Sequence, residues 1–190
     1  MLLLVGLGNP GSSYTNTRHN IGFKIIDAIN AHFKLSKQKP KFKGLLTTGS
    51  IDEKKIYAIK PLTFMNNSGT AIKELIDYFK IDAKDVFVFH DDMDIDFGKI
   101  KAKFGGSSAG HNGIESIDKF IGKDYSRVRI GIGHPKLKKK VNNHVLEDFK
   151  EDEEEKINEI TENIVKQLPT LIEKKIDLFS SKVNQDLNGI

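Results

Sequence analysis

Cysteine is absent from the 190 residues of this chain, and long apolar runs are absent as well. Without cysteine there can be no disulfide bridge, no thiolate metal site and no cysteine nucleophile. Nowhere do about 18 apolar residues follow one another, so no membrane-spanning helix is predicted. The apolar start Met1–Gly8 lacks the basic flank and the small-residue cleavage site of a targeting segment. Together these absences favour a cytoplasmic protein.

The charge balance is only slightly positive, with 30 Lys and Arg against 26 Asp and Glu and a formal net charge of +4. This total is a weak indication of a polyanionic partner. The distribution of the charges is more informative than their sum. Basic residues gather in Lys99–Lys103, Arg127–Arg129 and Lys136–Lys140, whereas acidic residues gather in Asp91–Asp96 and Glu151–Glu155. We therefore expect a locally basic face beside an acidic region.

Length and composition predict one globular domain spanning residues 1–190. Hydrophobic residues make up 38% and charged residues 29% of the chain, which is too apolar for a disordered protein. The segment Lys37–Lys43, which contains Pro40, is expected to be a connector. Apolar or alternating stretches predict strands at Leu2–Leu7, Gly44–Ser50, Lys54–Lys60, Asp85–His90, Phe97–Phe104 and Arg127–Gly133, the second and third forming a hairpin.

Apolar stripes with helical spacing separate most of these strands. The stripes run from Ile21 to Phe33, from Ile72 to Phe79 and from Ile114 to Ile121, and a longer helical segment covers about residues 151–182. Pro169 is expected to kink or split that last segment. Strands that alternate with helices, together with one hairpin, predict a single α/β domain with a twisted mixed β-sheet surrounded by α-helices.

Two glycine-rich motifs suggest chemistry that their context does not favour. Gly6–Gly11 matches the G-x-G-x-x-G fingerprint of dinucleotide-binding proteins, but the next helix starts only near Asn20, too late to meet a pyrophosphate. Gly106–Gly110 matches the G-x-S-x-G motif of serine esterases, with Ser108 as the nucleophile. The preceding strand is half-charged, unlike the buried central strand of those enzymes. A serine esterase therefore stays a second hypothesis.

The acidic segment His90–Asp96 has the carboxylates that a hard metal ion prefers, but it lacks the ligand spacing of an EF-hand loop. Its default interpretation is a solvated acidic loop. No metal site is predicted.

A set of polar side chains follows the predicted strands or flanks glycines, where α/β proteins place their functional sites. A histidine and an aspartate with several amides suit a hydrolase that activates water instead of forming an acyl-enzyme. The imidazole would take the proton of water, the carboxylate would fix the tautomer of the ring, and the amides would hold carbonyl groups and the developing oxyanion. The set comprises Asn9, His19, Asn66, Asp91, His111 and Asn112.

Several sequence blocks together resemble the bacterial-type peptidyl-tRNA hydrolases. They are Val5–Gly22, Lys60–Gly69, His90–Asp94 and Gly110–Gly113, extended by Arg127–Pro135. The blocks cover most of residues 2–135 in the order and approximate spacing of that family, whereas the region after residue 151 is similar only in length and helical character. The resemblance implies hydrolysis of the ester bond that joins a peptide to the 3′-terminal adenosine of tRNA, which releases free tRNA for translation.

The resemblance also implies a role for each matching residue. His19 would activate water, and Asp91 would orient His19 and stabilise its charged form. Asn9 would contact the peptide, while Asn66 and Asn112 would bind the junction of peptide and adenosine. The remaining residues that would contribute to substrate binding are Tyr14, Phe64, Met65 and His111.

Lys103 and Arg129 would bind tRNA phosphates, which agrees with the basic, half-exposed strands on which they lie. The implied partner is peptidyl-tRNA, recognised at its acceptor stem and 3′ end by a monomeric enzyme without metal or organic cofactor. Two features depart from the family pattern. The loop Gly105–Gly110 has fewer glycines than is common, and Asp96 stands near a position where the family often has proline. The added negative charge predicts somewhat weaker tRNA binding.

A third hypothesis is a non-catalytic RNA-binding module. Such a module would need the basic strands but not the pair of His19 and Asp91, so an assay for ester cleavage distinguishes it from an enzyme.

Overall fold

A computed structural model describes residues 1–135 and 141–187 of the chain, so the basic run Lys136–Lys140 lies outside the described residues. Within the described part, one mixed sheet has the strand order β2-β3-β4-β1-β5-β7-β6. The strands are β1 (Leu2–Gly6), β2 (Lys39–Lys41), β3 (Gly44–Ile51), β4 (Lys54–Pro61), β5 (Val86–Asp92), β6 (Ile100–Phe104) and β7 (Ser126–Gly131). The expected α/β domain with a mixed sheet is confirmed.

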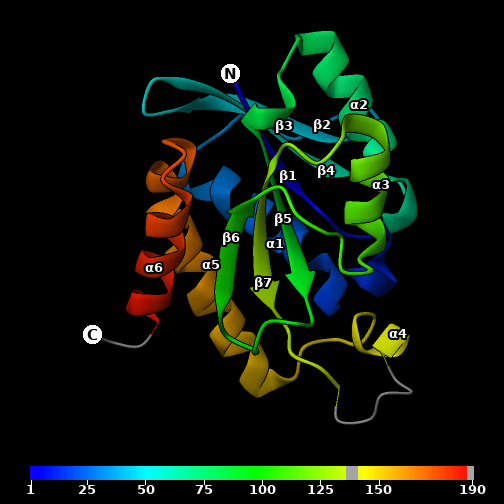
Figure 1. The fold of residues 1–190 in the computed structure, drawn as a ribbon, viewed down its shortest axis with the longest axis vertical. Helices are drawn as coiled ribbons and strands as arrows, with labels where there is room; N and C mark the ends of the chain where they lie inside the picture. Colours follow the sequence, from blue (N-terminus) through cyan, green and yellow to red (C-terminus); the bar gives the residue numbers. More distant parts are fainter. Residues whose placement is uncertain (136–140, 188–190) are drawn as a thin grey trace.

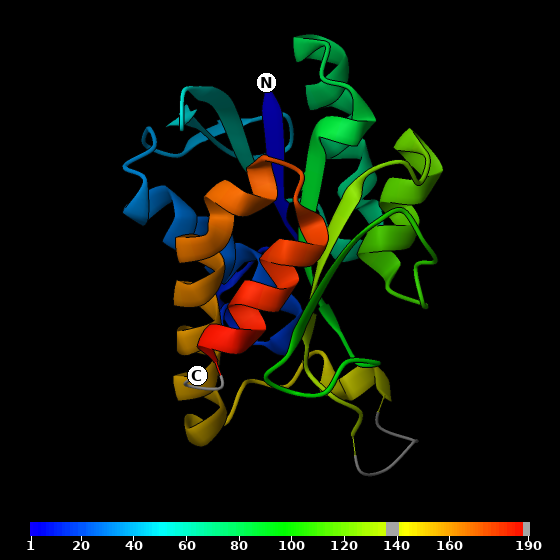
Figure 2. The same ribbon diagram turned by 60° about the vertical axis from the view of Figure 1, so that its left-hand side comes forward.

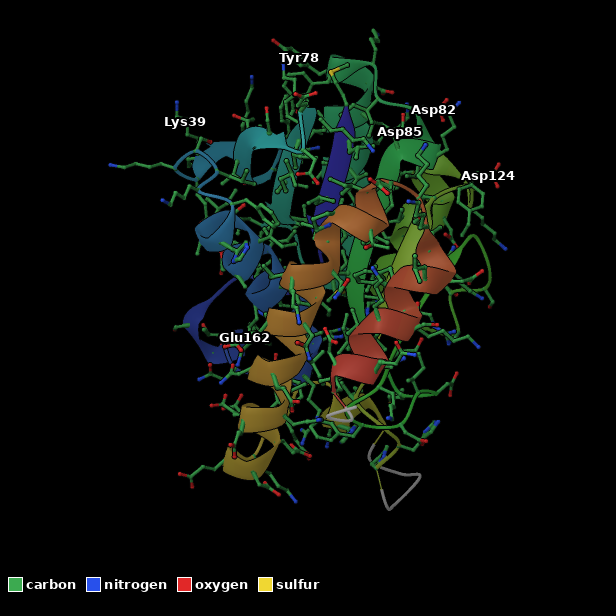
Figure 3. All side chains as sticks on the ribbon, turned by 90° about the vertical axis from the view of Figure 1, so that its left-hand side faces the viewer. Lys39, Tyr78, Asp82, Asp85, Asp124 and Glu162 are labelled. Carbon is green, nitrogen blue, oxygen red and sulfur yellow. The ribbon has the colours of Figure 1, made fainter. Side chains whose placement is uncertain are left out.

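The centre of the sheet is parallel and its flanks are antiparallel. Strands β4, β1, β5 and β7 run in the same direction, whereas β3 pairs antiparallel with β4 and β6 pairs antiparallel with β7. The carboxyl ends of the parallel strands therefore meet at one end of the molecule, where α4 (Val141–His144) lies at the bottom of Figure 1. Tyr78, Asp82 and Asp85 mark the opposite end, where β5 begins (Figure 3).

Helices cover both faces of the sheet and divide the core in two. Helices α1 (Ile21–His32), α5 (Glu151–Ile172) and α6 (Ile176–Asp186) pack on one face, with Leu2 and Leu4 of β1. Helices α2 (Ser68–Phe79) and α3 (Asn112–Ile121) pack on the other face, with Leu3 and Val5. Because both faces are covered, β1 is apolar throughout, as its sequence predicted. Figure 2 shows α5 and α6 side by side across their face.

The first turn of α1 lies directly against the sheet. A Cβ atom on Gly22 would come within 2.3 Å of the Leu7 nitrogen and 2.5 Å of the Phe89 oxygen, so only glycine fits between the helix and the two strands. A 3₁₀ turn, Arg18–Asn20, immediately precedes α1. The close approach at Gly22 therefore carries this turn to the carboxyl end of β5.

Side chains of α6 bind the edge strand β6. The amide of Asn184 accepts the N–H of Ile100 (3.0 Å) and donates to its carbonyl oxygen (2.9 Å), while Ser180 Oγ accepts the N–H of Ala102 (2.8 Å). The opposite edge is the three-residue strand β2. Its position corrects the expectation of a connector at Lys37–Lys43, because an edge strand tolerates the missing N–H of Pro40.

The C-terminal helical segment is divided in two, but Pro169 does not split it. Helix α5 continues through Pro169 to Ile172, and the break before α6 falls at residues 173–175, where Lys174 has a φ of 64°. Proline removes one hydrogen bond of the helix, but the buried side chains of Leu168 and Leu171 hold the chain against the core on both sides of it. Among the described residues, none of the helices has the length and apolar character needed to cross a membrane.

Candidate active site

The predicted polar residues converge where three neighbouring parallel strands end. Asn9 follows β1, the 3₁₀ turn Met65–Asn67 follows β4, and Asp91 lies in the last part of β5. Because β4, β1 and β5 are adjacent in the sheet, residues far apart in the sequence meet at this end. Crevices outside the carboxyl ends of such strands are the usual ligand sites of α/β proteins.

The centre of the site is a buried carboxylate between two imidazole rings. Nδ1 of His19 lies 2.8 Å from Oδ1 of Asp91, and Nε2 of His111 lies 3.0 Å from the same oxygen. His19 comes from the turn before α1, and His111 is the N-cap residue of α3. The centroids of the two rings are 4.8 Å apart. The predicted pairing of His19 with Asp91 is therefore present, and a second histidine shares the carboxylate.

The hydrogen bond to Asp91 decides which nitrogen of His19 can act as a base. A carboxylate accepts, so Nδ1 of His19 carries the proton and donates it. The lone pair of the neutral ring then lies on Nε2. This atom can accept a proton from a water molecule in front of the ring.

Burial and charge shift the titration of this group of side chains. Burial lowers the pKa of His19, but the charge and hydrogen bond of Asp91 raise it by more, so the net pKa lies above the ordinary 6.5. Burial favours a neutral Asp91, yet the facing rings of His19 and His111 hold the pKa of that carboxyl well below its usual range. Behind them, full burial keeps the pKa of His90 well below 6.5. The site thus holds an ionised Asp91 beside a titrating His19.

Backbone contacts from a distant segment fix the turn that carries His19. The N–H of His19 donates to the carbonyl oxygen of Val145 (2.8 Å), and the N–H of Arg18 donates to that of Glu147 (3.1 Å). The buried guanidinium of Arg18 also donates to Glu153 Oε2 in the first turn of α5 (2.7 Å). Sequence reasoning did not single out Arg18 or Glu153, because nothing local signals a contact between residues 135 positions apart.

Asn9 is held in one orientation by its neighbours. Its Oδ1 accepts the N–H of Met65 (2.8 Å), and its backbone exchanges two hydrogen bonds with the side-chain amide of Asn20 (2.9 and 3.0 Å). This arrangement leaves the NH₂ of Asn9 as the group to offer to a carbonyl oxygen. Asn20 was also missed from the sequence, although its position next to His19 was a signal.

Two hollows adjoin the central pair. One, of about 210 Å³, is lined by residues that include His19, Asp91, His111 and Asn112. The other, of about 490 Å³, is lined by residues that include Asn66, Asn112 and Phe120. Asn112 borders both hollows and is the lining residue that they share.

Three further residues that were predicted to contribute to substrate binding differ in exposure. Phe64 is 60% exposed just before the Met65 turn, and Tyr14 is half-buried in the 3₁₀ turn after β1. The side chain of Met65 is buried, and its sulfur packs against Gly113 at the start of α3. Phe64 therefore offers an exposed aromatic surface, whereas Met65 packs against the start of α3.

The two basic strands present their charges on the α2–α3 face of the sheet. Lys101 pairs with Arg129 and Lys103 pairs with Arg127 across β6 and β7. Burial and the nearby cations Arg129, Arg127 and Lys101 lower the pKa of Lys103, which shows how closely these charges gather. The sequence-predicted cluster around Lys103 and Arg129 is therefore present.

Two of these cations also bind protein groups. Arg129 Nε donates to Asp92 Oδ2 (2.7 Å), a residue that sequence reasoning treated only as part of an acidic loop. Arg127 is buried and donates to Asp118 Oδ1 (2.6 Å) and to the carbonyl oxygen of Ser107 (2.7 Å). Arg127 thus anchors the loop Gly105–Gly110, while Arg129 stands beside the catalytic end of β5.

The structure weakens the two glycine-motif hypotheses. After Gly11 the chain forms 3₁₀ turns, and α1 begins only at Ile21. Ser108 follows β6, which is an antiparallel edge strand and not the central parallel strand of a serine esterase.

His19, Asp91 and His111 also form the one group of histidine and acidic side chains, among the described residues, close enough to hold a metal ion. Their ligand atoms lie within 4.8 Å of one another. Both ring nitrogens that face Asp91 are engaged in hydrogen bonds to it, which accounts for the convergence. The absence of a metal from the mechanism stays a prediction.

The fold and the site define an α/β enzyme with a buried histidine–aspartate pair at the carboxyl ends of its parallel strands, an arrangement suited to hydrolysis by activated water. The family model of Peptidyl-tRNA hydrolase matches residues 3–189. This chain belongs to the peptidyl-tRNA hydrolase family, as its motifs predicted.

Individual relatives agree with that membership. The chain is 72% identical over 184 residues to the peptidyl-tRNA hydrolase of Pelagibacter ubique (strain HTCC1062), which covers 97% of this chain and 99% of that protein. Identity to the peptidyl-tRNA hydrolase of Ehrlichia ruminantium (strain Welgevonden) is 47%, over 95% of this chain and 93% of that one. The crystal structure of peptidyl-tRNA hydrolase from Acinetobacter baumannii superposes with a TM-score of 0.90 at 33% identity, covering 97% and 94%.

Proposed function

We propose that this chain hydrolyses the ester bond between a peptide and the 3′-terminal adenosine of tRNA, releasing free tRNA and a peptide with a free carboxyl group. Membership of the family supports the substrate. The observation that carries the chemistry is the 2.8 Å hydrogen bond from His19 Nδ1 to Asp91, which leaves His19 Nε2 as the base.

The proposed reaction needs no covalent enzyme intermediate. His19 Nε2 takes a proton from water while the water oxygen attacks the ester carbonyl, and the resulting imidazolium is stabilised by the ionised Asp91. The tetrahedral intermediate then collapses, and His19 returns the proton to the ribose oxygen that leaves. Asp91 keeps its charge throughout, which agrees with its lowered pKa.

Three asparagine side chains bind the substrate in the proposed reaction. Asn9 offers its NH₂ to a carbonyl of the peptide, because Oδ1 is already bound to Met65. Asn66 and Asn112 bind the junction of peptide and adenosine, and Asn112 borders both hollows. Hydrogen-bond donors aimed at the developing oxyanion lower the barrier because they are already oriented when the charge forms.

Recognition of tRNA rests on charge and stacking. Lys103 and Arg129 contact phosphates of the acceptor stem, and the exposed ring of Phe64, with Tyr14, suits contacts to an unpaired base near the 3′ end. We place the enzyme in the cytoplasm, where tRNA is used, and propose that it acts as a monomer because one chain carries all of these groups.

A deacylation assay tests the proposal. The wild-type protein is expected to hydrolyse N-acetyl-aminoacyl-tRNA, and His19→Ala is expected to abolish turnover while tRNA binding largely persists. The exposed residue His32, at the end of α1, provides the control His32→Ala, which should keep full activity.

Three outcomes contradict the proposal. Near-normal turnover by His19→Ala would show that His19 is not the general base. Labelling of Ser108 by a phosphonate, together with loss of activity in Ser108→Ala, would favour a serine esterase. Binding of tRNA by the wild-type protein without ester cleavage would favour an RNA-binding module.

A further inference from the structure

The side chain of His111 lies between the N-terminus of α3 and the carboxylate of Asp91. Its Nδ1 accepts the backbone N–H groups of Gly113 (3.1 Å) and Ile114 (3.3 Å), as an N-cap side chain does. Its Nε2 lies 3.0 Å from Asp91 Oδ1. Both ring nitrogens are therefore engaged with protein groups.

These contacts fix the protonation of the ring. A backbone N–H can only donate, so Nδ1 of His111 must be the unprotonated nitrogen. The single proton of the ring then lies on Nε2 and points at Asp91. His111 is thus a neutral donor of fixed tautomer.

Asp91 consequently accepts two N–H groups on the same oxygen, one from each ring. His19 is the partner that gains a proton during hydrolysis, whereas His111 donates before and after that step. A neutral donor fixes the carboxylate and partly balances its charge without competing for the proton. Several titratable groups surround His111. They are Asp91 and His90 of β5, His19, Glu115 of α3, and Asp92 and Asp94, which line the 210 Å³ hollow together with His111.

We propose that His111 is a positioning residue for the hydrolysis: its Nε2–H fixes Asp91, and Asp91 in turn presents His19 to water. This replaces the contact with substrate that its sequence motif implied. The inference rests on the proposed function only where its test measures hydrolysis of peptidyl-tRNA.

Nuclear magnetic resonance of ¹⁵N-labelled protein tests the protonation without any substrate. Two-bond ¹H–¹⁵N correlations of the six histidines distinguish the two neutral tautomers and the imidazolium. At pH 7 His111 is expected as the neutral ring protonated on Nε2. The other tautomer or an imidazolium would overturn the inference, whether or not the protein hydrolyses peptidyl-tRNA.

Two substitutions separate positioning from helix capping. Asn is a preferred N-cap residue, so His111→Asn keeps an oxygen for the N–H groups of α3, but its shorter side chain does not reach Asp91. We expect His111→Asn to lower kcat about 10-fold, with a change in KM of less than about two-fold. His111→Ala should show the same kinetic loss with a lower melting temperature as well, and His32→Asn serves as the control.

The pH profile gives a readout that a merely structural role would not move. Without the His111 donor, the charge of Asp91 is less balanced and stabilises protonated His19 more. The acidic limb of kcat/KM in His111→Asn is therefore expected to move up by about one pH unit. The inference would be overturned if His111→Asn kept both the acidic limb and the kcat of the wild-type protein. A higher KM with an unchanged kcat in His111→Asn would overturn it as well. Failure of the wild-type protein to hydrolyse the ester would instead contradict the proposed function.

Discussion

Asp91 is the residue on which the proposed reaction depends. Its side chain is 2% exposed, and burying an ionised carboxylate is unfavourable unless hydrogen bonds replace the lost water. The two ring N–H groups supply that replacement. In the proposed reaction the same oxygen stabilises His19 when that ring gains a proton, so the buried charge is kept for the transition state.

The raised pKa of His19 predicts the pH dependence of activity. Only neutral His19 can take a proton from water, and its pKa lies above 6.5, so kcat/KM should rise with pH through a midpoint above 6.5. Asp91→Asn removes the cause that raises this pKa and leaves the burial that lowers it. The midpoint should therefore move to lower pH, while the plateau falls about 10²–10⁴-fold.

Steady-state kinetics between pH 5 and 9 check this prediction. The exposed Asp124, at the far end of the molecule in Figure 3, provides the control Asp124→Asn, which should keep both midpoint and plateau. An unchanged plateau in Asp91→Asn would remove Asp91 from the mechanism.

At the scale of elements, the position of His19 depends on contacts from parts of the chain that are distant in sequence. Gly22 lets α1 approach β1 and β5, while the segment Val145–Phe149 binds the backbone of the His19 turn from the other side. Arg18 connects that turn to α5 through Glu153. The base is thus held between the sheet and the start of the C-terminal helices.

Loss of the Arg18–Glu153 contact should affect stability and catalysis together. Glu153→Gln removes the nearer of the two carboxylates around the buried Arg18, leaving Glu147 Oε2 at 3.8 Å, and is expected to lower the free energy of unfolding by about 1–3 kcal/mol. Because the His19 turn loosens, kcat should fall more than KM changes. Denaturant unfolding and kinetics measure both effects.

Glu151→Gln is the matched control for that substitution. It removes an exposed carboxylate from the same first turn of α5, so any effect through the helix dipole is equal. Equal stability of the two variants would show that the contact with Arg18 contributes nothing.

At the scale of the whole molecule, the distribution of charge matters more than the total of +4. On the α2–α3 face, alternate residues of β6 and β7 carry Lys101, Lys103, Arg127 and Arg129, and Arg127 is the one buried by the loop Gly105–Gly110. The opposite faces of the same strands are apolar and pack against the C-terminal helices. Strand alternation therefore places the basic side chains in a row beside the active site.

This row predicts a salt-dependent affinity for tRNA. Each phosphate contact releases condensed counterions, so Lys103→Gln and Arg129→Gln should each reduce the slope of log affinity against log salt by about one. Titrations of tRNA at several salt concentrations measure the slope. Lys39→Gln, an exposed lysine on the opposite edge of the sheet (Figure 3), should leave it unchanged.

An affinity that does not depend on salt would contradict the phosphate contacts. A change of slope in Lys39→Gln equal to that in Arg129→Gln would show that the effect is not local to β6 and β7.

Much of the fold could be predicted because its signals are local. Apolar runs marked β1 and β5, and alternation marked β6 and β7, since each strand's pattern reflects which faces are covered. The errors fell where tertiary contacts override local preference. Pro169 stays helical because the core holds the chain on both sides of it, and Lys39–Lys41 forms a strand because β3 offers a partner.

The site was predictable where chemistry and position coincide in sequence. Residue type and position singled out two histidines and Asp91, the family resemblance paired Asp91 with His19, and the structure joins this pair. The sequence did not predict the roles of Arg18 and Asn20, nor the hydrogen bond from His111 to Asp91. Each of these contacts involves a partner that only the folded chain brings near. Supporting contacts of this kind leave no local pattern.

The two edges of the sheet also decide how copies of this protein behave at high concentration. A bare edge strand is a template for backbone pairing with another molecule, the first step of β-aggregation. In the described part of the chain, Asn184 and Ser180 occupy backbone groups of β6 as a neighbouring strand would. The other edge is only Lys-Pro-Lys, whose charges and missing N–H discourage a further strand. Both edges of the sheet are thereby closed to a strand of a second molecule, which keeps copies of the protein apart at high concentration.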